Sequence, residues 1–300
     1  MTITLRDVTL RDGLQDERVV STADKLRLFE ALVLAGVRDI ELASFVRADR
    51  VPAMADARPL VAAATSLVAD REVRISALVP NRRGAIDAIA AGVRHLVFVL
   101  SVSDRHNRGN VGLSTDESIA ALATVVETAG RDADVEVVLA TALGCPYTGP
   151  VPADDVVERA RQAAAAGVVG VSIADTIGSG VPSEVRALVS AVHAATRLPV
   201  GAHLHDTRGL GVANALAAIE AGAARVDGAV GGLGGCPFAP GASGNLALED
   251  LADCLNGMSV PTGIDTGRLT DAAALACALV GKPVTSHVGV AGPRFARLAT

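Results

Sequence analysis

The most constraining feature of this sequence is a phrase that recurs four times, in which an alanine-rich segment ends in Ala-Gly and a short apolar run follows. The four copies begin at Ala35, Ala91, Ala166 and Ala221. Glycine supplies the left-handed residue that ends a helix, and the apolar run after it is typical of a buried strand. Each interval between copies is long enough for two strand–helix units of about 30 residues. The chain is therefore expected to alternate helices with parallel strands.

Filling in the intervals gives eight strand segments separated by helical patterns. We expect strands near residues 3–10, 38–43, 73–79, 95–101, 135–141, 169–175, 198–205 and 225–230. We expect helices near 22–35, 51–69, 82–91, 115–130, 153–166, 182–196 and 209–222, and two C-terminal ones near 244–256 and 266–280. This pattern predicts an α/β fold, a (β/α)8 TIM barrel with additional C-terminal helices. An open doubly wound sheet is the alternative, but it would normally carry a glycine-rich fingerprint where Arg-Asp-Gly stands here.

Length and composition fit one such barrel. The 300 residues are half hydrophobic, with 30 glycines, one tyrosine, five phenylalanines and no tryptophan. Alanine and valine therefore carry the packing, as expected where alanine-rich helices cover buried parallel strands. We expect a single domain over residues 1–300, with the barrel at about 3–230, a lid loop at about 231–244 and the C-terminal helices at about 244–280.

Composition also argues against several classes of partner. The formal net charge is −6, and no basic patch interleaved with aromatic residues indicates nucleic-acid binding. No apolar run reaches the roughly 18 residues of a membrane span, and the first residues lack the apolar core of a signal peptide. The four cysteines have no paired spacing, so we expect free thiols and a cytoplasmic protein.

The candidate site centres on two histidines, His203 and His205, which stand two residues apart behind an apolar run. On a strand, side chains two apart point to the same face. Both imidazoles then project from one side of the strand end, which is a common arrangement for metal ligands. A bare His-x-His is equally compatible with one buried and one surface histidine, so the other strand ends must decide.

In a barrel of this type the site lies at the C-terminal ends of the strands. Nearly every expected strand ends in a polar group, including Arg11-Asp12, Glu41, Ser44, Ser101, Thr141 and Asp175. A surface loop explains one such residue easily, but it explains a ring of them poorly. Within this ring, Glu41 and Asp175 are candidates for groups that orient the histidines or Arg11.

The strand ends and the segment after them offer a set of two imidazoles and two oxygen ligands, from Asp12, His203, His205 and Asn245. Completed by oxygens of substrate or water, this set makes an octahedral site suited to Mg²⁺ or Mn²⁺. Zn²⁺ would more often use three protein ligands. Two members have simpler alternatives. Asp12 also fits a turn before Gly13, and Asn245 taken alone fits better as the N-cap of the following helix.

The loop at 231–244 is dense in glycine and carries Cys236. Loops of this kind can close over a site as lids. Most free cysteines are small buried hydrophobes, and we interpret Cys254 and Cys277 in that way because they fall on helices. Cys236 differs because it falls at the expected mouth of the barrel, where it is a candidate for proton transfer.

Six segments, taken in chain order, make the sequence resemble the 3-hydroxy-3-methylglutaryl-CoA lyases from about residue 3 to about residue 280. They are Arg11-Asp12-Gly13-Leu14-Gln15, Glu41-Leu42-Ala43-Ser44-Phe45, Ala142-Leu143-Gly144-Cys145-Pro146-Tyr147, Ile173-Ala174-Asp175-Thr176-Ile177-Gly178, His203-Leu204-His205-Asp206-Thr207 and Gly232-Leu233-Gly234-Gly235-Cys236-Pro237. The Arg-Asp-Gly and His-x-His segments are shared with the isopropylmalate and homocitrate synthases, which belong to the same wider family of metal-dependent barrels. The two Gly-Cys-Pro segments resemble the lyase branch.

The resemblance implies a carbon–carbon lyase that cleaves 3-hydroxy-3-methylglutaryl-CoA, an acyl-CoA thioester, to acetyl-CoA and acetoacetate with a bound Mg²⁺ or Mn²⁺. It implies four metal ligands, which are Asp12, His203, His205 and Asn245. It implies further site residues, which are Arg11 for the enolate charge, Cys236 and His203 for proton transfer, and Glu41, Asp175 and Glu249 in supporting roles. A homodimer and a role in leucine degradation would also fit the family.

Some residues depart from the lyase pattern. Val8-Thr9-Leu10 precedes Arg11 where the lyases usually have Val-Gly-Pro, and the segment at 103–110 also differs. These departures leave the metal ligands intact but raise a close 3-hydroxy-3-alkylglutaryl-CoA as an alternative substrate. Two other functions stay open. One is a condensing synthase or aldolase that uses acetyl-CoA or pyruvate with a 2-oxo acid or aldehyde, although such synthases often carry a C-terminal regulatory domain. The other is a non-catalytic acyl-CoA-binding barrel.

Overall fold

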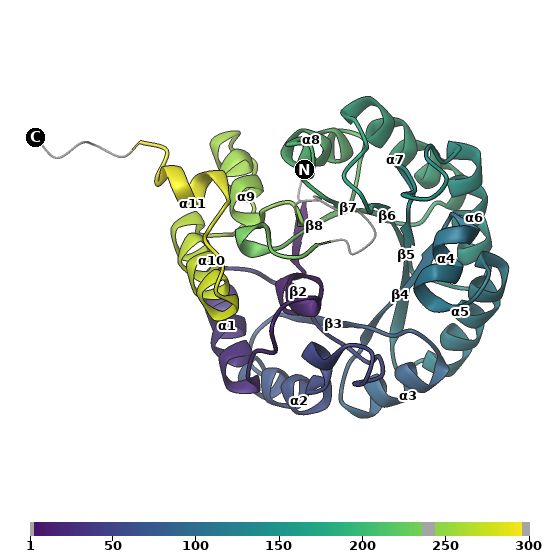
Figure 1. Ribbon diagram of the computed structural model, residues 1–300, viewed down its shortest axis with the longest axis horizontal. Helices are drawn as coiled ribbons and strands as arrows, with labels where there is room; N and C mark the ends of the chain where they lie inside the picture. The colour runs from purple at the N-terminus through teal and green to yellow at the C-terminus, as the bar shows by residue number, and fades with distance from the viewer. Residues whose placement is uncertain (1–2, 236–243, 296–300) are drawn as a thin grey trace, which may run out of the picture.

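The computed structural model describes residues 3–235 and 244–295, which contain a closed barrel of parallel strands. Neighbouring strands follow chain order, and β8 closes the barrel against β1. The strands are β1 Thr4–Asp7, β2 Asp39–Ser44, β3 Arg74–Leu78, β4 His95–Ser101, β5 Asp134–Ala140, β6 Gly170–Asp175, β7 Val200–Leu204 and β8 Arg225–Gly228. The expected (β/α)8 barrel is confirmed, and Figure 1 shows its strands inside a ring of helices.

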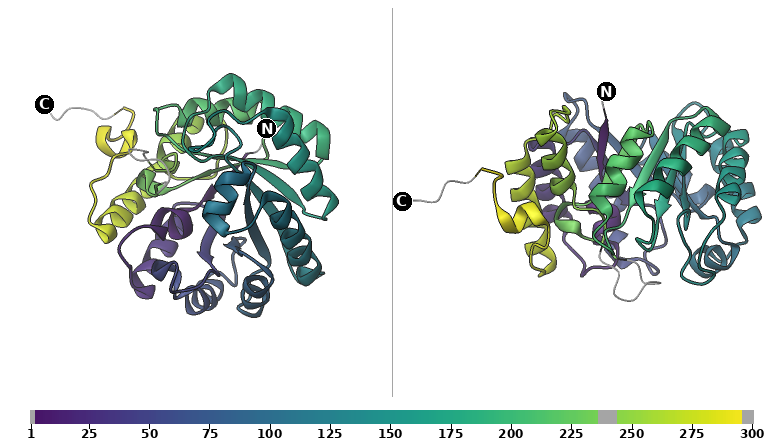
Figure 2. Two further views of the ribbon diagram at one scale, coloured as in Figure 1. Left: turned by 45° about the vertical axis from the view of Figure 1, so that its right-hand side comes forward. Right: turned by 90° about the horizontal axis from the view of Figure 1, so that it is seen from above.

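The helices of the ring alternate with the strands. They are α1 Thr22–Leu34, α2 Ala57–Leu67 with a short 3-10 turn at Pro52–Met54 before it, α3 Arg82–Ala90, α5 Thr115–Ala129, α6 Ala153–Ala165, α7 Pro182–Thr196 and α8 Gly211–Glu220. The expected C-terminal helices are α9 Leu248–Gly257 and α10 Thr266–Val280. These two pack between α8 and α1 and so complete the ring (Figures 1 and 2). No helix in the described ranges is long and apolar enough to cross a membrane.

Two short helices were not expected from the sequence. Helix α4 Asp104–Val111 follows β4 directly, and α11 His287–Ala291 lies against α9 near the C-terminal end of the described chain. Ser103 caps α4, because its hydroxyl accepts a hydrogen bond from the backbone N–H of His106. Helix α4 therefore stands at the mouth of the barrel, over the end of β4.

Two of the differences between the expected and the observed boundaries shape the mouth. The strand expected at 3–10 ends at Asp7, whose carboxylate accepts hydrogen bonds from the N–H and the hydroxyl of Thr9, at 3.0 and 2.7 Å. The chain then makes a π-helical turn over Thr9–Gly13. The helix expected from residue 244 begins only at Leu248, because Leu246 N–H instead donates to the Leu204 carbonyl at 2.9 Å, which keeps this segment beside β7.

The strand register determines which side chains face the barrel interior. Paired residues on neighbouring parallel strands point to the same side of the sheet. Arg6 pairs with Asp39 and Asp227, and Asp227 pairs with His203, so these side chains share the interior. Alternation along β2 adds Glu41. Side chains on the opposite face of the sheet form the apolar core against the helices.

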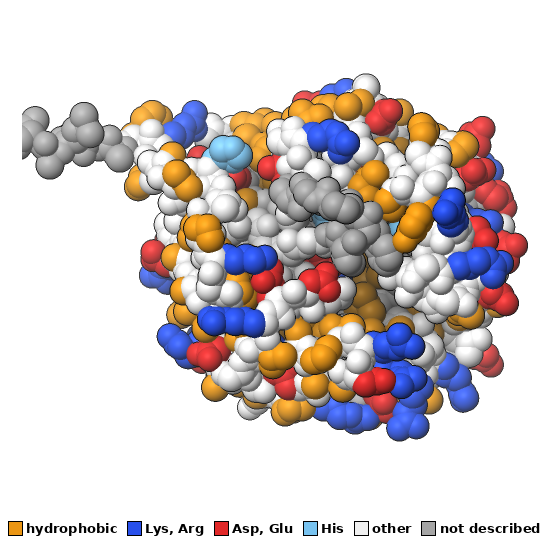
Figure 3. Space-filling model, in the orientation of Figure 1, with side chains coloured by type: hydrophobic (Ala, Val, Ile, Leu, Met, Phe, Trp, Pro, Cys, Tyr) orange, Lys and Arg blue, Asp and Glu red, His pale blue; other side chains and the backbone are white. Residues whose placement is uncertain are grey.

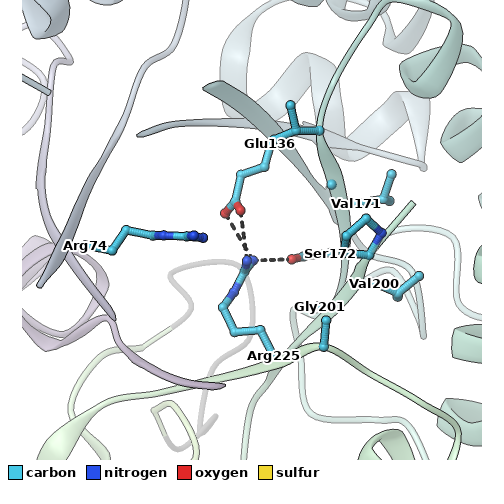
Figure 4. A pocket seen from close by; sticks show the side chains of 11 residues that line it. Arg74, Glu136, Val171, Ser172, Val200, Gly201 and Arg225 are labelled. Carbon is cyan, nitrogen blue, oxygen red and sulfur yellow. Dashed lines mark hydrogen bonds and ion pairs between the residues drawn. The ribbon is translucent and has the colours of Figure 1, made fainter. Parts of the chain in front are cut away.

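The N-terminal end of the interior is filled by charged side chains that bind one another. Arg6 donates to Asp39 at 3.0 Å, and Arg6 and Arg225 both donate to Glu136. Arg225 also donates to Asp227 at 3.0 Å. A cavity of about 100 Å³ opens beside Arg225 and Glu136 (Figure 4). TIM barrels usually fill their interior with branched aliphatic side chains, so this network is an unusual feature of the core.

Candidate functional site

His203 and His205 lie together at the C-terminal end of β7, as their spacing predicts. His203 belongs to the strand, and His205 follows it in a single β-bridge to Asn245. Their Nε2 atoms are 3.3 Å apart, and His203 Nε2 lies 4.0 Å from Asp12 Oδ2. Asp12 comes from the π-helical turn after β1. The structure therefore brings together side chains that are about 190 residues apart in the sequence.

Asn245 joins this group from the segment before α9. The N-cap alternative for Asn245 is wrong, because α9 begins at Leu248 and Ala247 holds its N-cap position. Asn245 Nδ2 donates to Asp12 Oδ2 at 2.7 Å and to the Leu233 carbonyl at 3.0 Å. Its Oδ1 is buried and has no hydrogen-bond partner among the described residues. Leaving such an atom unpaired costs about 1–3 kcal/mol, which a bound cation would offset.

The donor atoms fit a divalent metal ion. One ligand atom each of Asp12, His203 and His205 lies within 4.8 Å of the other two, and Asn245 is hydrogen-bonded to Asp12. Imidazole nitrogens combined with carboxylate and amide oxygens are ligands that Mg²⁺ and Mn²⁺ accept. Figure 3 shows acidic side chains gathered around the hollow at the centre of this face. The structure thus contains a possible metal-binding cluster, while the identity of the ion stays a prediction.

Arg11 lies beside the cluster and is held by two carboxylates. Its Nε and Nη2 donate to the two oxygens of Glu41 at 2.8 and 3.0 Å, and its Nη1 donates to Asp12. Burial alone would lower the pKa of Arg11, but the charges of Glu41 and Asp12 raise it well above its usual value. The guanidinium is therefore charged and fixed in direction. The sequence analysis gave Glu41 and Asp175 as candidates for orienting Arg11, and Glu41 is the one that contacts it.

Burial and the neighbouring charges keep Asp12 and His205 in forms that bind metal. Burial raises the pKa of Asp12, but Arg11 and His203 outweigh this effect, and the pKa falls to about 2. Burial, followed by the charge of His203, lowers the pKa of His205 to about 4. At neutral pH, Asp12 is therefore a carboxylate and His205 a neutral imidazole, which are the forms that metal binding requires.

Asp227 on β8 is a member of the site that the sequence analysis missed. It is 2% exposed, and its Oδ2 lies 3.4 Å from His203 Nδ1. Burial lowers the pKa of His203, but the hydrogen bond to Asp227 and the charge of Asp12 raise it above its usual value. The available signal was an aspartate in the eighth expected strand. Its contact with His203, however, depends on the register between β7 and β8, which the sequence alone does not give.

Asp175 lies at the end of β6 but is not in contact with Arg11 or either histidine. It pairs in register with Leu204, so its side chain leaves the sheet on the face opposite to His203. Its carboxylate accepts hydrogen bonds from the N–H groups of Ser179 and Gly180, at 2.9 and 3.0 Å. The structure therefore places Asp175 in the turn after β6, and its catalytic role stays a prediction.

The base of the expected lid loop is held by Glu249 and by a glycine. Glu249 Oε1 accepts a hydrogen bond from Gly231 N–H at 2.8 Å, and burial raises the pKa of Glu249 to about 7. Gly234 has a φ of +110°, and a Cβ there would lie 2.6 Å from Asn245 Nδ2, so only glycine fits beside Asn245. Cys236 and the rest of the loop to residue 243 lie outside the described residues.

A second polar group lies at the mouth ends of β4 and β5. Ser101 Oγ is 2.7 Å from His106 Nδ1, and Ser103 N–H donates to Thr141 Oγ1 at 3.2 Å. Thr141 has a φ of 59°, which is rare for a β-branched residue and is a form of strain often found at functional sites. His106 belongs to the segment at 103–110, so the part of the chain that departs from the lyase pattern lies at the mouth of the barrel.

Comparison with known proteins agrees with this geometry. The HMGL-like family model matches residues 2–276. The chain belongs to the HMGL-like family. It is 41% identical to the (R)-citramalyl-CoA lyase of Chloroflexus aurantiacus, over 99% of this chain and 97% of that protein. It is 37% identical to a hydroxymethylglutaryl-CoA lyase of Bacillus subtilis, over 95% of each.

A solved structure extends the likeness of this HMGL-like chain to three dimensions. The HMG-CoA lyase from Acinetobacter baumannii, in complex with coenzyme A and 3-methylmalate, superposes with a TM-score of 0.93 at 34% identity, over 100% of this chain and 98% of that one. The HMGL-like chain is a carbon–carbon lyase by this family relation, as the sequence predicted. The relatives act on different acyl-CoA thioesters by name, so membership of the family leaves the acyl group open.

Proposed function

We propose that this chain cleaves 3-hydroxy-3-methylglutaryl-CoA, or a close 3-hydroxy-3-alkylglutaryl-CoA, and for the methyl compound releases acetyl-CoA and acetoacetate. Mg²⁺ or Mn²⁺ would be held by Asp12, His203, His205 and Asn245. When bound, such an ion polarises the tertiary hydroxyl and the carboxylate oxygen of the substrate. The observation that carries the proposal is this donor set, with two buried histidines and a partly buried aspartate, and a charged arginine fixed beside it.

The reaction breaks the bond between C2 and C3 of the acyl chain. The hydroxyl on C3 loses its proton, its oxygen becomes a carbonyl, and the electron pair of the broken bond passes to the thioester fragment as an enolate. A proton then reaches the enolate carbon and completes acetyl-CoA. Cys236 and His203 are the candidates for these proton transfers, because both residue types exchange protons near neutral pH.

Arg11 supplies the fixed positive charge that this reaction needs where the enolate forms. An arginine has five N–H donors, and Glu41 and Asp12 occupy three of them. The remaining donors are available to a developing oxyanion. Because Glu41 fixes the guanidinium before the reaction starts, the group does not have to reorganise as charge develops.

A second candidate substrate is citramalyl-CoA, favoured by the 41% identity to the lyase named for it. Both compounds carry a tertiary hydroxyl on C3 of the acyl chain, so the same bond breaks. In citramalyl-CoA the carboxylate is attached directly to C3, and the second product is pyruvate. The two substrates therefore share the metal and Arg11, and differ in how far the carboxylate extends into the mouth.

A coupled assay for acetyl-CoA release tests the proposal, with 3-hydroxy-3-methylglutaryl-CoA, its longer 3-alkyl analogues and citramalyl-CoA as substrates. Each is run with Mg²⁺, Mn²⁺ or EDTA. Cleavage of the methyl compound that EDTA abolishes supports the first candidate, whereas faster cleavage of citramalyl-CoA supports the second. Condensation of acetyl-CoA with a 2-oxo acid, in place of any cleavage, would contradict both. Light scattering on the same preparation tests the predicted homodimer.

A further inference from the structure

Asp227 occupies a position between the metal cluster and the charged network at the other end of the barrel. Its Oδ2 lies 3.4 Å from Nδ1 of His203, and its Oδ1 accepts a hydrogen bond from Nε of Arg225 at 3.0 Å. The residue is buried, and the two strands that carry it and His203 are directly paired at these positions. Each carboxylate oxygen therefore has a different partner.

We infer that Asp227 is a positioning residue that fixes His203 as the Nδ1–H tautomer, so that Nε2 offers its lone pair to the metal. This inference rests on the proposed metal site. An ionised carboxylate only accepts hydrogen bonds, so the ring nitrogen that faces it must carry the proton. A neutral imidazole then has its lone pair on Nε2. That atom faces the other ligands, 3.3 Å from His205 Nε2 and 4.0 Å from Asp12 Oδ2.

Arg225 and Glu136 hold Asp227 in place from the opposite side. Glu136 accepts hydrogen bonds from both terminal nitrogens of Arg225, at 2.9 and 3.1 Å, and Ser172 Oγ accepts another at 2.7 Å (Figure 4). A Cβ at Gly201 would lie 2.3 Å from Ser172 Oγ and 2.9 Å from Arg225 Nη2, so a side chain there would displace this hydrogen-bonded pair. Arg225 is therefore fixed on three sides, and it directs the Asp227 carboxylate toward His203.

The two histidine ligands are not equivalent in this respect. His205 Nδ1 is buried and has no hydrogen-bond partner among the described residues. His205 therefore lacks the carboxylate partner that Asp227 gives to Nδ1 of His203. Carboxylates in this position orient metal ligands and raise their basicity, and removing them typically weakens metal binding about 10- to 100-fold.

The inference also bears on proton transfer. If Nδ1 of His203 donates to Asp227 and Nε2 binds the metal, neither nitrogen is free to accept a proton from the substrate. His203 then acts as a ligand alone. Of the two predicted candidates for proton transfer, Cys236 remains.

The test combines NMR of the imidazole nitrogens with Mn²⁺ affinity measured by electron paramagnetic resonance. In the metal-free wild-type protein, at a pH where the ring is neutral, His203 is expected to be the Nδ1–H tautomer. In Asp227→Asn, the single carbonyl oxygen is expected to keep the bond to Arg225, which leaves the amide NH₂ facing His203. The tautomer should then reverse, and Mn²⁺ should bind about 10- to 100-fold more weakly.

Asp39→Asn is the matched control, because it makes the same chemical change in the same charged network at a carboxylate that accepts from Arg6 and not from His203. It should preserve the tautomer and leave Mn²⁺ affinity within about twofold. Equal losses of affinity in both variants would overturn the inference, and so would an Nε2–H tautomer in the wild-type protein, a result that needs no variant to fold. Failure of the wild-type protein to bind Mn²⁺ would refute the metal site itself, whereas the tautomer reports on Asp227 independently.

Discussion

The two ends of the barrel interior are both polar and both buried, but their polar atoms are satisfied in different ways. At the N-terminal end, Arg6 and Arg225 share Glu136, and Asp39 and Asp227 complete the network. At the C-terminal end, Asn245 Oδ1 and His205 Nδ1 are buried and have no hydrogen-bond partner in the described chain. The first end is complete without a ligand, and the second is not.

This difference separates structural polarity from functional polarity. A buried charge is tolerated only when it is paired, and a buried polar atom only when something accepts or donates to it. The N-terminal network meets this condition with its own side chains, so its residues are expected to determine stability. The C-terminal cluster meets it only with a ligand, so its residues are expected to determine binding and turnover.

His205→Ala should have the largest effect on turnover. It removes one proposed metal ligand, and metal polarisation contributes several kcal/mol to the stabilisation of the transition state, so acetyl-CoA release should fall roughly 1,000-fold. Metal content, measured by elemental analysis, should fall with it. The control is His95→Ala, which removes a partly exposed histidine at the N-terminal end whose ring lies 3.5 Å from Asp134. Unchanged turnover in His205→Ala would remove this residue from the metal site.

Glu136→Ala should have the largest effect on stability. It leaves Arg6 and Arg225 buried without their shared carboxylate, and breaking a buried ion pair in this way costs about 3–5 kcal/mol. Urea unfolding of the metal-free protein measures the loss. Glu158→Ala is the matched control. Glu158 is exposed and its carboxylate lies 3.9 Å from Arg161, so removing this surface ion pair should lower the free energy of unfolding by less than about 1 kcal/mol. Similar values for the two variants would show that the N-terminal network is not what stabilises the barrel.

The sequence predicted the barrel and the polar residues that gather at its mouth, because a polar residue at the end of an apolar strand is visible without coordinates. It did not predict Asp227, whose importance depends on the register that places it beside His203. Nor did it predict that the side chain of Asp175 leaves β6 on the outer face of the sheet, because the apolar run alone does not show which of its residues face the interior. Helix α4 was missed because Asp104–Val111 is polar on all sides and so lacks an apolar stripe.

Saturating Mn²⁺ should stabilise the wild-type protein but not His205→Ala. A ligand that binds only the folded state adds about 2.7 kcal/mol at a concentration 100 times its Kd. Thermal unfolding followed with and without Mn²⁺ measures this gain, and EDTA should reverse it. The same gain in both proteins would place the bound ion elsewhere and would remove the distinction between the two ends of the barrel.

Asp7→Asn should have the smallest effect on stability. It tests a third way in which a buried carboxyl group can be tolerated, which is for the group to stay protonated. Asp7 is fully buried, and burial raises its pKa to about 7 despite hydrogen bonds from Thr9. Because this value exceeds the unfolded one, the stability that the protonated group contributes is complete below about pH 4 and is lost as the pH rises through about 7. The free energy of unfolding should fall by about 2 kcal/mol over this range, because the effective dielectric constant around buried charges is higher than that of a dry protein interior.

The amide that Asp7→Asn introduces cannot ionise, so the variant should lose less stability than the wild type between about pH 5 and about pH 8, as measured by urea unfolding. Burial also raises the pKa of Glu249 to about 7, so this residue accounts for a second part of the loss of wild-type stability with rising pH. Glu249→Gln should remove that part separately. Parallel pH profiles for the wild type and Asp7→Asn would mean that Asp7 is ionised when buried. It would then need a cationic partner like those of the N-terminal network, and no such partner contacts it in the described chain.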